Sequence, residues 1–327
     1  MLARVMFSAI VLLFCSLSQA QTSIANPEIK ALPALSLPPS ILPSLDAAPA
    51  LPTIFARVAE VNLVLSVTND HGHFVRDLNE SDIVISDNGE PPAKITYFQT
   101  RTDLPLRVAL VNDTSDSVAY RFAFEIKSAE AFLKRVLRPK DDAALIVGFN
   151  QRPTLVTPPT ADVSKLSRGL RGMKPCGETA LYDAIAFASD RLLDIPGSVD
   201  PVRRVIVLVT DGEENRSNIS LDDAVEHALR TESVIYVVNT REITVTREDR
   251  FGEEVINRLA QSTGGRVLAG RTETDVSESF HKIQEELRSQ YALGYRPRSL
   301  LGNLFHPIRI FGPKGIRIRT RQGYYAR

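Results

Sequence analysis

The sequence predicts a doubly wound α/β fold, a mostly parallel sheet covered by helices on both faces, with a small β unit at each end. Two patterns carry this prediction. From residue 104 onward, short continuous apolar runs alternate with amphipathic stretches of helical period, which is typical of strands buried in a parallel sheet. Before and after that region, residues alternate singly between apolar and polar, as in strands with one solvated face.

Composition limits the possible classes of function. The chain has 327 residues and is 43% hydrophobic, which is enough for one sizeable core and a smaller satellite domain. Lys and Arg together number 39, as do Asp and Glu, so no overall charge attracts nucleic acid or an anionic membrane. Aromatic residues make up 7% and Trp is absent, so no stacking surface for bases is indicated. We therefore expect no nucleic-acid partner.

Residues 1–20 have the layout of a signal peptide. Arg4 supplies a positive start, residues 5–17 are mostly apolar, and residues 18–20 (Ser-Gln-Ala) form a small-x-small cleavage site. The apolar run is shorter than the roughly 20 residues that span a bilayer. We therefore expect a secreted or periplasmic protein with no membrane span after cleavage, and a retained membrane anchor is the alternative. Residues 21–53 are rich in Pro and Ala and are expected to form an extended linker.

Residues 54–100 form the predicted N-terminal β unit, because apolar and polar residues alternate near both of its ends. Turn signals lie between these alternating stretches, at 71–73 and 88–89. His71 and His73 flank one turn glycine and could suggest a metal pair. No Cys or third His is near them in sequence, so a solvated turn is the preferred interpretation.

Residues 104–290 form the predicted α/β domain. Apolar runs predict its strands, and stretches that place apolar residues on one helical face predict its helices. The expected strands are 107–112, 143–149, 153–158, 204–210, 234–239 and 266–269. The expected helices are 120–137, 179–194, 220–231, 251–262 and 275–289. The run at 153–158 is expected to pair beside the strand that precedes it.

Residues 291–327 return to single alternation and predict a strand followed by a basic β hairpin. The expected hairpin strands, 307–311 and 316–321, alternate apolar residues with Arg and flank a turn at 312–315. No Asp or Glu occurs from Arg296 to the last residue. The arginines are interpreted as the solvated face of the strands, and contact with phosphate is the alternative. We expect the two β units to pack together, which makes the α/β domain an insertion between them.

Three loops carry side chains that point to a metal site. The first strand of the α/β domain is followed by Asp113, Ser115 and Ser117, a middle loop contains Thr179, and a later strand is followed by Asp211. In an open α/β sheet, ligands bind where such loops converge outside the carboxyl ends of the strands. All five side chains offer hard oxygens, and none offers a thiolate or imidazole. The set therefore favours Mg²⁺, with Mn²⁺ or Ca²⁺ as alternatives, over zinc or copper.

The strings DTSDS, GETALYDAI and VIVLVTDGEEN, each in its expected context, resemble the metal-ion-dependent adhesion site of von Willebrand factor type A domains. That pattern is Asp-x-Ser-x-Ser, a Thr in a middle loop, and a later Asp. The resemblance covers about residues 104–289 and implies a Rossmann-like domain whose metal holds a Glu or Asp of a partner protein. With its flanking segments, the chain is similar to a group of bacterial secreted proteins that contain this domain. We therefore expect an exported, adhesion-type binding module and not an enzyme.

Asp116 departs from the family pattern, which usually has Gly between the two serines. Its carboxylate either points to solvent or adds negative potential that favours Ca²⁺ or weakens capture of an acidic partner. Glu213 and Glu214 are interpreted as part of a solvated loop after the strand. Asp183 is interpreted as a support for the loop that contains Thr179.

Two alternative functions remain. A metal-assisted phosphoryl-transfer enzyme would use Asp113 as its nucleophile, although Ser115 stands where such sites commonly have a second acid. None of the five His lies in the three loops to act as acid or base. The other alternative is a purely structural metal site in an assembly protein. Cys176 is single once Cys15 leaves with the signal, so no internal disulfide is expected.

Overall fold

A computed structural model describes residues 60–100, 104–195, 202–241, 247–299 and 304–326. The predicted signal peptide at 1–20 and the predicted linker at 21–53 lie outside these residues. None of the helices within the described ranges is long and apolar enough to cross a membrane.

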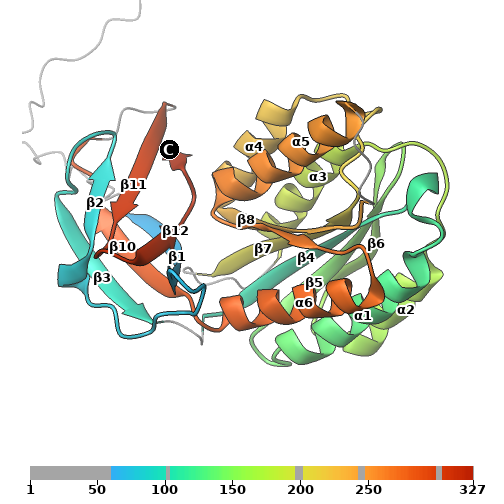
Figure 1. Ribbon diagram of the computed structural model, residues 1–327, viewed down its shortest axis with the longest axis horizontal. Coiled ribbons are helices and arrows are strands. Elements are labelled where there is room, and N and C mark those ends of the chain that lie inside the picture. The colour runs from blue at the N-terminus through green and yellow to red at the C-terminus, as the bar shows by residue number, and fades with distance from the viewer. Residues whose placement is uncertain (1–59, 101–103, 196–201, 242–246, 300–303, 327) are drawn as a thin grey trace, which may run out of the picture. The chain divides into compact units, whose positions relative to one another are not determined.

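The central sheet has six strands in the order β6-β5-β4-β7-β8-β9 (Figure 1). Its strands are β4 (Leu106–Asp113), β5 (Ala143–Phe149), β6 (Pro153–Thr160), β7 (Arg203–Thr210), β8 (Ser233–Asn239) and β9 (Val267–Ala269). All neighbours pair in parallel except β5 and β6, which are antiparallel. Every residue of β4 is buried, as expected for the middle of a sheet with both faces covered.

Helices cover both faces of this sheet (Figure 1). They are α1 (Phe122–Val136), α2 (Val163–Gly172), α3 (Leu181–Leu193), α4 (Leu221–Arg230), α5 (Arg247–Thr263) and α6 (Glu273–Leu287). Apolar residues of α1, α2 and α6 form one core with the strands, and those of α3, α4 and α5 form a second core on the opposite face. The predicted doubly wound α/β fold is confirmed.

The strand order places a switch in winding direction between β4 and β7. The chain passes from β4 outward to β5 on one side, and it returns to build β7, β8 and β9 on the other. Consecutive crossovers therefore leave the sheet in opposite directions at the ends of β4 and β7, which is where ligands bind in open α/β sheets. The last residues of these two strands are neighbours, because Asn112 pairs with Val209.

Several elements of the α/β domain differ from the sequence-based expectation, and α5 begins at Arg247 rather than at Phe251. Helix α2 was not predicted, although Asp162 caps it by accepting hydrogen bonds from the N–H groups of Ser164 and Lys165. Helix α3 begins at Leu181 rather than Thr179, because the N–H of Ala180 donates to the carbonyl of Asn150 outside the helix. The strand expected at 153–158 does pair antiparallel beside β5, as β6.

Strands from both ends of the chain form one β module, the unit made of β1–β3 and β10–β13. These strands are β1 (Val61–Asn69), β2 (Val84–Asp87), β3 (Lys94–Thr100), β10 (Tyr291–Arg296), β11 (Phe305–Phe311), β12 (Ile316–Arg319) and β13 (Gly323–Tyr325). One sheet has the order β12-β1-β10-β3 and the other β13-β11-β2, so each sheet contains strands from before and after the α/β domain, and in the first sheet they alternate. The expectation that the two β regions pack together is confirmed by this pairing.

The expected C-terminal hairpin is wrong, because its two strands lie in different sheets. Strand β11 pairs with β2 and β13, whereas β12 pairs with β1. The turn at 312–315 therefore carries the chain from one sheet to the other. Single alternation identifies a strand and its buried face, but it does not identify the partner strand.

The turn at 71–73 agrees with its interpretation as a solvated turn. His71 and His73 are exposed, and Gly72 has φ +79°, a conformation that glycine adopts without strain. The N–H groups of both histidines donate to Asn69 Oδ1 at 3.0 Å, so the side chain of Asn69 holds the turn.

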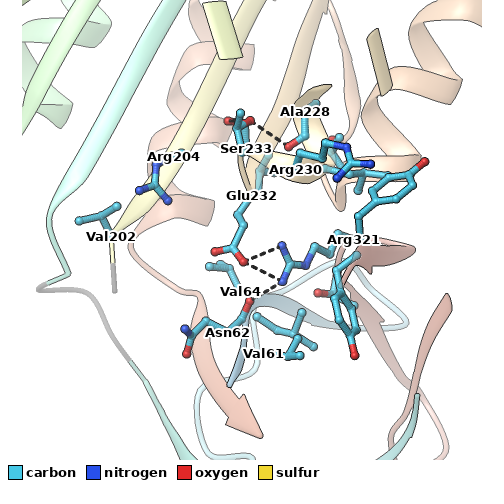
Figure 2. A pocket seen from close by; sticks show the side chains of 18 of the residues that line it. Val61, Asn62, Val64, Val202, Arg204, Ala228, Arg230, Glu232, Ser233 and Arg321 are labelled. Atoms are coloured by element: carbon cyan, nitrogen blue, oxygen red, sulfur yellow. Dashed lines mark hydrogen bonds and ion pairs between the residues drawn. The ribbon is translucent and has the colours of Figure 1, made fainter. Parts of the chain in front are cut away.

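Two arginines that were expected on a solvated face instead join the β module to the α/β domain. Arg319 Nη2 donates to Glu286 Oε1 at 2.7 Å, and Glu286, on α6, is completely buried. Arg321 lies 3.2 Å from Glu232 and donates to the carbonyl of Asn62 (Figure 2). Only Arg309 and Arg317 of the C-terminal strands have the exposed side chains that were expected.

A cavity of about 300 Å³ lies at this junction (Figure 2). It is lined by residues of β1, of the loop between α4 and β8 and of the segment after β12, including Val64, Glu232 and Arg321. The ion pair of Glu232 with Arg321 crosses from one side of the cavity to the other.

Candidate metal centre

Asp113 is the last residue of β4, at the point where the winding of the sheet changes direction. Its side chain lies in the interior, with 1% of the residue exposed. Its Oδ1 accepts the N–H of Ser115 at 2.9 Å, and its Oδ2 accepts the hydroxyl of Thr210 at 2.7 Å. Because Thr210 ends β7, this second bond joins the two strands at the switch point.

Ser115 and Ser117 place two hydroxyl oxygens side by side. Their Oγ atoms are 3.1 Å apart, and a short 3-10 turn from Asp116 to Val118 sets this spacing. Adjacent ligands of an octahedral Mg²⁺, each about 2.1 Å from the ion, are about 3.0 Å apart. Ser115 is buried and Ser117 half-buried, so the pair opens to solvent on the Ser117 side. Asp116 is exposed, which agrees with the interpretation that its carboxylate points to solvent.

Thr179 lies in the loop before α3 and is 1% exposed. Its N–H donates to Asn215 Oδ1 at 2.9 Å, and its carbonyl accepts the N–H of Asn215 at 3.1 Å. The first loop is joined to the same segment by backbone bonds, from Asp116 N–H to the Gly177 carbonyl and from Cys176 N–H to the Thr114 carbonyl. All three loops are therefore held at one edge of the sheet.

Asp211 follows β7 and is 4% exposed. Its Oδ1 accepts the N–H of Glu213 at 3.1 Å, and its Oδ2 lies 3.3 Å from Arg121 Nη2. The next residue, Gly212, has φ +78°, and a Cβ there would meet the carbonyl oxygen of Gly252 at 3.0 Å. Glycine is therefore required where the chain turns away from the site.

The electrostatics of the site favour a cation. Burial, together with repulsion from Asp211, raises the pKa of Asp113 to about 7. The described residues hold no group of three or more His, Cys, Asp or Glu side chains suited to a metal ion. The candidate donors are therefore the carboxylates of Asp113 and Asp211 and the hydroxyls of Ser115 and Ser117. Such hard oxygens fit Mg²⁺, Mn²⁺ or Ca²⁺.

Arg121 and Glu125 also belong to this site, and the sequence-based set omits them. Arg121 immediately precedes α1, and Glu125 lies one turn further along, with side chains 4% and 1% exposed. Burial, opposed by Arg121, raises the pKa of Glu125 to about 8. Their positions beside the apolar stripe of α1 were the available signal, but charged residues at such positions are usually solvated.

Glu214 was misread as part of a solvated loop. Its Oε2 accepts the N–H groups of Leu181 and Tyr182 at 2.7 and 3.1 Å, so it caps the first turn of α3. Asp183 was interpreted as a support for the neighbouring loop, and it accepts the N–H and the side-chain amide of Asn218. Both carboxylates connect α3 to the loop after β7.

Comparison with known proteins gives a family for the central part of the chain. Residues 108–214 match the family model of the von Willebrand factor type A domain. This segment runs from β4 to the loop after β7 and contains all five predicted ligands.

Several solved structures are similar to this chain. The PilB minor pilin from Streptococcus sanguinis is 14% identical with a TM-score of 0.45, and 62% of this chain matches 63% of that pilin. BatB from Bacteroides thetaiotaomicron is 18% identical with a TM-score of 0.45, and 56% of this chain covers 100% of it. A von Willebrand factor type A protein from Catenulispora acidiphila is 9% identical with a TM-score of 0.48, and 83% of this chain matches 75% of that protein. The chain thus spans less than two thirds of the length of the pilin.

Proposed function

Because residues 108–214 match the family model of the von Willebrand factor type A domain, we propose that this protein is an exported, metal-dependent protein-binding module. Asp113, Ser115, Ser117, Thr179 and Asp211 would hold one divalent cation, with Mg²⁺ expected and Mn²⁺ or Ca²⁺ as alternatives. The bound ion would supply an open coordination position for a Glu or Asp side chain of a partner protein. This proposal is supported by two buried carboxylates that repel each other and a pair of adjacent hydroxyls, all at or just after the ends of β4 and β7.

The charge of the site supports the metal. Asp113 and Asp211 are almost completely buried, and repulsion from Asp211 adds to burial in disfavouring the ionised form of Asp113. A divalent cation between the loops would offset this repulsion. The hydroxyls add ligands without adding charge, so the ion would remain electrophilic enough to accept a further carboxylate.

Exposed aromatic residues near the site support a protein as the partner. Tyr120 lies three residues after Ser117 and is 65% exposed, and Phe251 is 58% exposed. Phe251 precedes Gly252, which approaches the loop at Gly212 closely. Large exposed aromatic side chains around a polar centre are typical of protein-binding surfaces.

The surroundings of Asp113 speak against the alternative of phosphoryl transfer. A nucleophilic carboxylate needs an oxygen that the substrate can approach, but both oxygens of Asp113 accept hydrogen bonds and the residue is 1% exposed. Turnover of a generic phosphate ester that is lost in D113N would overturn this ranking.

Thermal unfolding of chelated protein tests the metal site. Mg²⁺ or Mn²⁺ at 100 times its dissociation constant should stabilise the folded state by about 2.7 kcal/mol and raise the Tm by several degrees. D113N should abolish the rise, whereas the control D141N, at an exposed carboxylate before β5, should keep it. No rise with Mg²⁺, Mn²⁺ or Ca²⁺ would refute the metal site.

Affinity capture with and without chelator tests the partner. Binding should be lost on chelation and in D113N, and restored by added metal. A partner that stays bound under both conditions would show that the ion only joins the loops, which is the structural alternative.

A further inference from the structure

A buried ion pair lies directly beside the proposed metal ligands. The guanidinium of Arg121 contacts Asp211 Oδ2 at 3.3 Å with Nη2, and Glu125 Oε1 at 3.5 Å with Nε. It also donates to the hydroxyl of Tyr120 and lies 4.7 Å from the centre of that ring. Arg121 is therefore held from three sides, with one of its contacts made to a predicted metal ligand.

Glu125 is buried with little compensation for its charge. It is 1% exposed, it pairs with Arg121, and an interaction with the Thr240 side chain lowers its pKa, but neither carboxylate oxygen makes a described hydrogen bond of ordinary geometry. Buried carboxylates are normally satisfied by hydrogen bonds, because an unsatisfied one costs free energy. Its field acts on the site, since repulsion from Asp113 and Asp211 contributes to the raised pKa of Glu125.

Carboxylates outnumber cations in this cluster. Asp113, Asp211 and Glu125 are three carboxylates, and the Arg121 side chain contacts the carboxylates of Asp211 and Glu125. Arg241 Nε approaches from outside the cluster and donates to the backbone carbonyl of Asp211 at 2.6 Å. Fully ionised, Arg121 and the three carboxylates leave two negative charges, which favour a bound cation. Without Glu125 the cluster would carry one negative charge, and without Arg121 it would carry three.

We propose that Arg121 and Glu125 set the affinity of this site for divalent cations in opposite directions, Arg121 lowering it and Glu125 raising it. This inference rests on the proposed metal site. Arg121 competes with the ion for Asp211 and repels its charge, and Glu125 offsets that repulsion while remaining outside the ligand set. Both are positioning residues that act on the metal through Asp211 and through their charge.

The direction in which two substitutions change the affinity for Mg²⁺ distinguishes this role from a structural one. If the pair only supported the loops, removal of either partner would loosen Asp211 and weaken metal binding in both variants. If the pair sets the charge, R121Q should bind Mg²⁺ more tightly and E125Q more weakly. A unit charge within several ångströms of a divalent ion near the protein surface changes its dissociation constant by about tenfold or more.

Isothermal titration of Mg²⁺ and Mn²⁺ into chelated full-length protein at pH 8.5 tests the inference. We expect about a tenfold lower Kd for R121Q, about a tenfold higher Kd for E125Q, and a Kd within about threefold of wild type for R121K, which keeps the charge. Because R121Q leaves Glu125 buried without its partner, the neutral pair R121Q/E125Q serves as a second variant. It should fold, by circular dichroism, and bind more tightly than E125Q.

The outcomes distinguish the inference from the proposed function. Weaker binding in both R121Q and E125Q, or an unchanged Kd in both, would overturn the inference and leave the metal site standing. Binding by R121Q but not by wild type would support the inference and overturn the proposed function. Absence of binding in every variant would overturn both.

Discussion

At the residue scale, the surroundings of Asp113 link proton binding, metal binding and the stability of the fold. Its carboxylate accepts hydrogen bonds from Ser115 and Thr210, yet burial and Asp211 favour its protonated form. A proton and a divalent cation would therefore compete for this group.

The raised pKa of Asp113 predicts how the stability of the metal-free protein depends on pH. The folded pKa of about 7 lies above the ordinary value of 3.8, so the folded state binds more protons than the unfolded state between these values. The contribution is full below about pH 4 and is lost as the pH rises through about 7. The free energy of unfolding should fall by a few kcal/mol over this range, and Glu125 should extend the fall to about pH 8.

Urea denaturation with chelator at pH 5 and pH 8 measures this loss. D113N, which cannot ionise, should lose less stability than wild type over the same interval, and saturating Mg²⁺ should reduce the loss in wild type. Equal losses in D113N and wild type would show that another group controls the pH dependence.

At the element scale, the start of α3 depends on a carboxylate from another loop. Ala180, the residue before α3, makes no side-chain cap, and Glu214 supplies the missing acceptor from the loop after β7. The same Glu214 accepts the N–H groups of Arg216 and Ser217, so it also shapes its own loop. One side chain thereby joins two of the three loops of the site.

E214Q should therefore destabilise the protein and weaken metal binding together. Loss of the charge at the helix N-terminus and of part of the cap should lower the free energy of unfolding by about 1–2 kcal/mol. Because Thr179 lies two residues before α3, the Kd for Mg²⁺ should also rise. The control E178Q, in an exposed ion pair of 3.4 Å with Arg216, should change stability by less than about 0.5 kcal/mol. Equal effects of E214Q and E178Q in denaturation and titration would contradict the capping role.

At the scale of the whole molecule, Glu286 joins the β module to the α/β domain. Its Oε1 accepts hydrogen bonds from Ser66 of β1, Tyr236 of β8 and Arg319 of β12, and Arg266 lies 2.9 Å from Oε2. Segments far apart in the sequence thus converge on one buried carboxylate. We infer that this cluster helps the two regions to unfold together.

E286Q should lower the free energy of unfolding by about 2 kcal/mol or more, because it removes the charge that two arginines share. The loss should stay near this value because Arg319 and Arg266 are about a third exposed and can turn toward water. E273Q, in an exposed pair with Lys127, is the control and should change stability by less than about 0.5 kcal/mol. Guanidinium denaturation followed by two probes checks both values. Two separate transitions in wild type would contradict the coupling of the two regions.

The α/β domain was largely predictable because its signals are local. The strand at 143–149 agrees with β5 to the residue, since a continuous apolar run is bounded by polar residues. Helix α2 was missed, because its apolar positions Leu166 and Leu170 lie among polar residues in a short segment. Asp113 and Asp211 could be proposed as ligands because they lie at or just after the ends of strands, whereas Arg121 and Glu125 lie at the start of a helix, where charged residues are usually solvated.

By itself the sequence determined the strand-and-helix order, the switch-point loops and the oxygen chemistry of the candidate site, because these depend on residue type and short-range spacing. Only the tertiary structure decided which strands of the β module pair, that Arg319 and Arg321 face ion-pair partners, and that Arg121 and Glu125 stand beside Asp211. These features join residues far apart in the chain or bury charges that local patterns assign to solvent. Their energies depend on burial and on partners, which no window of sequence contains.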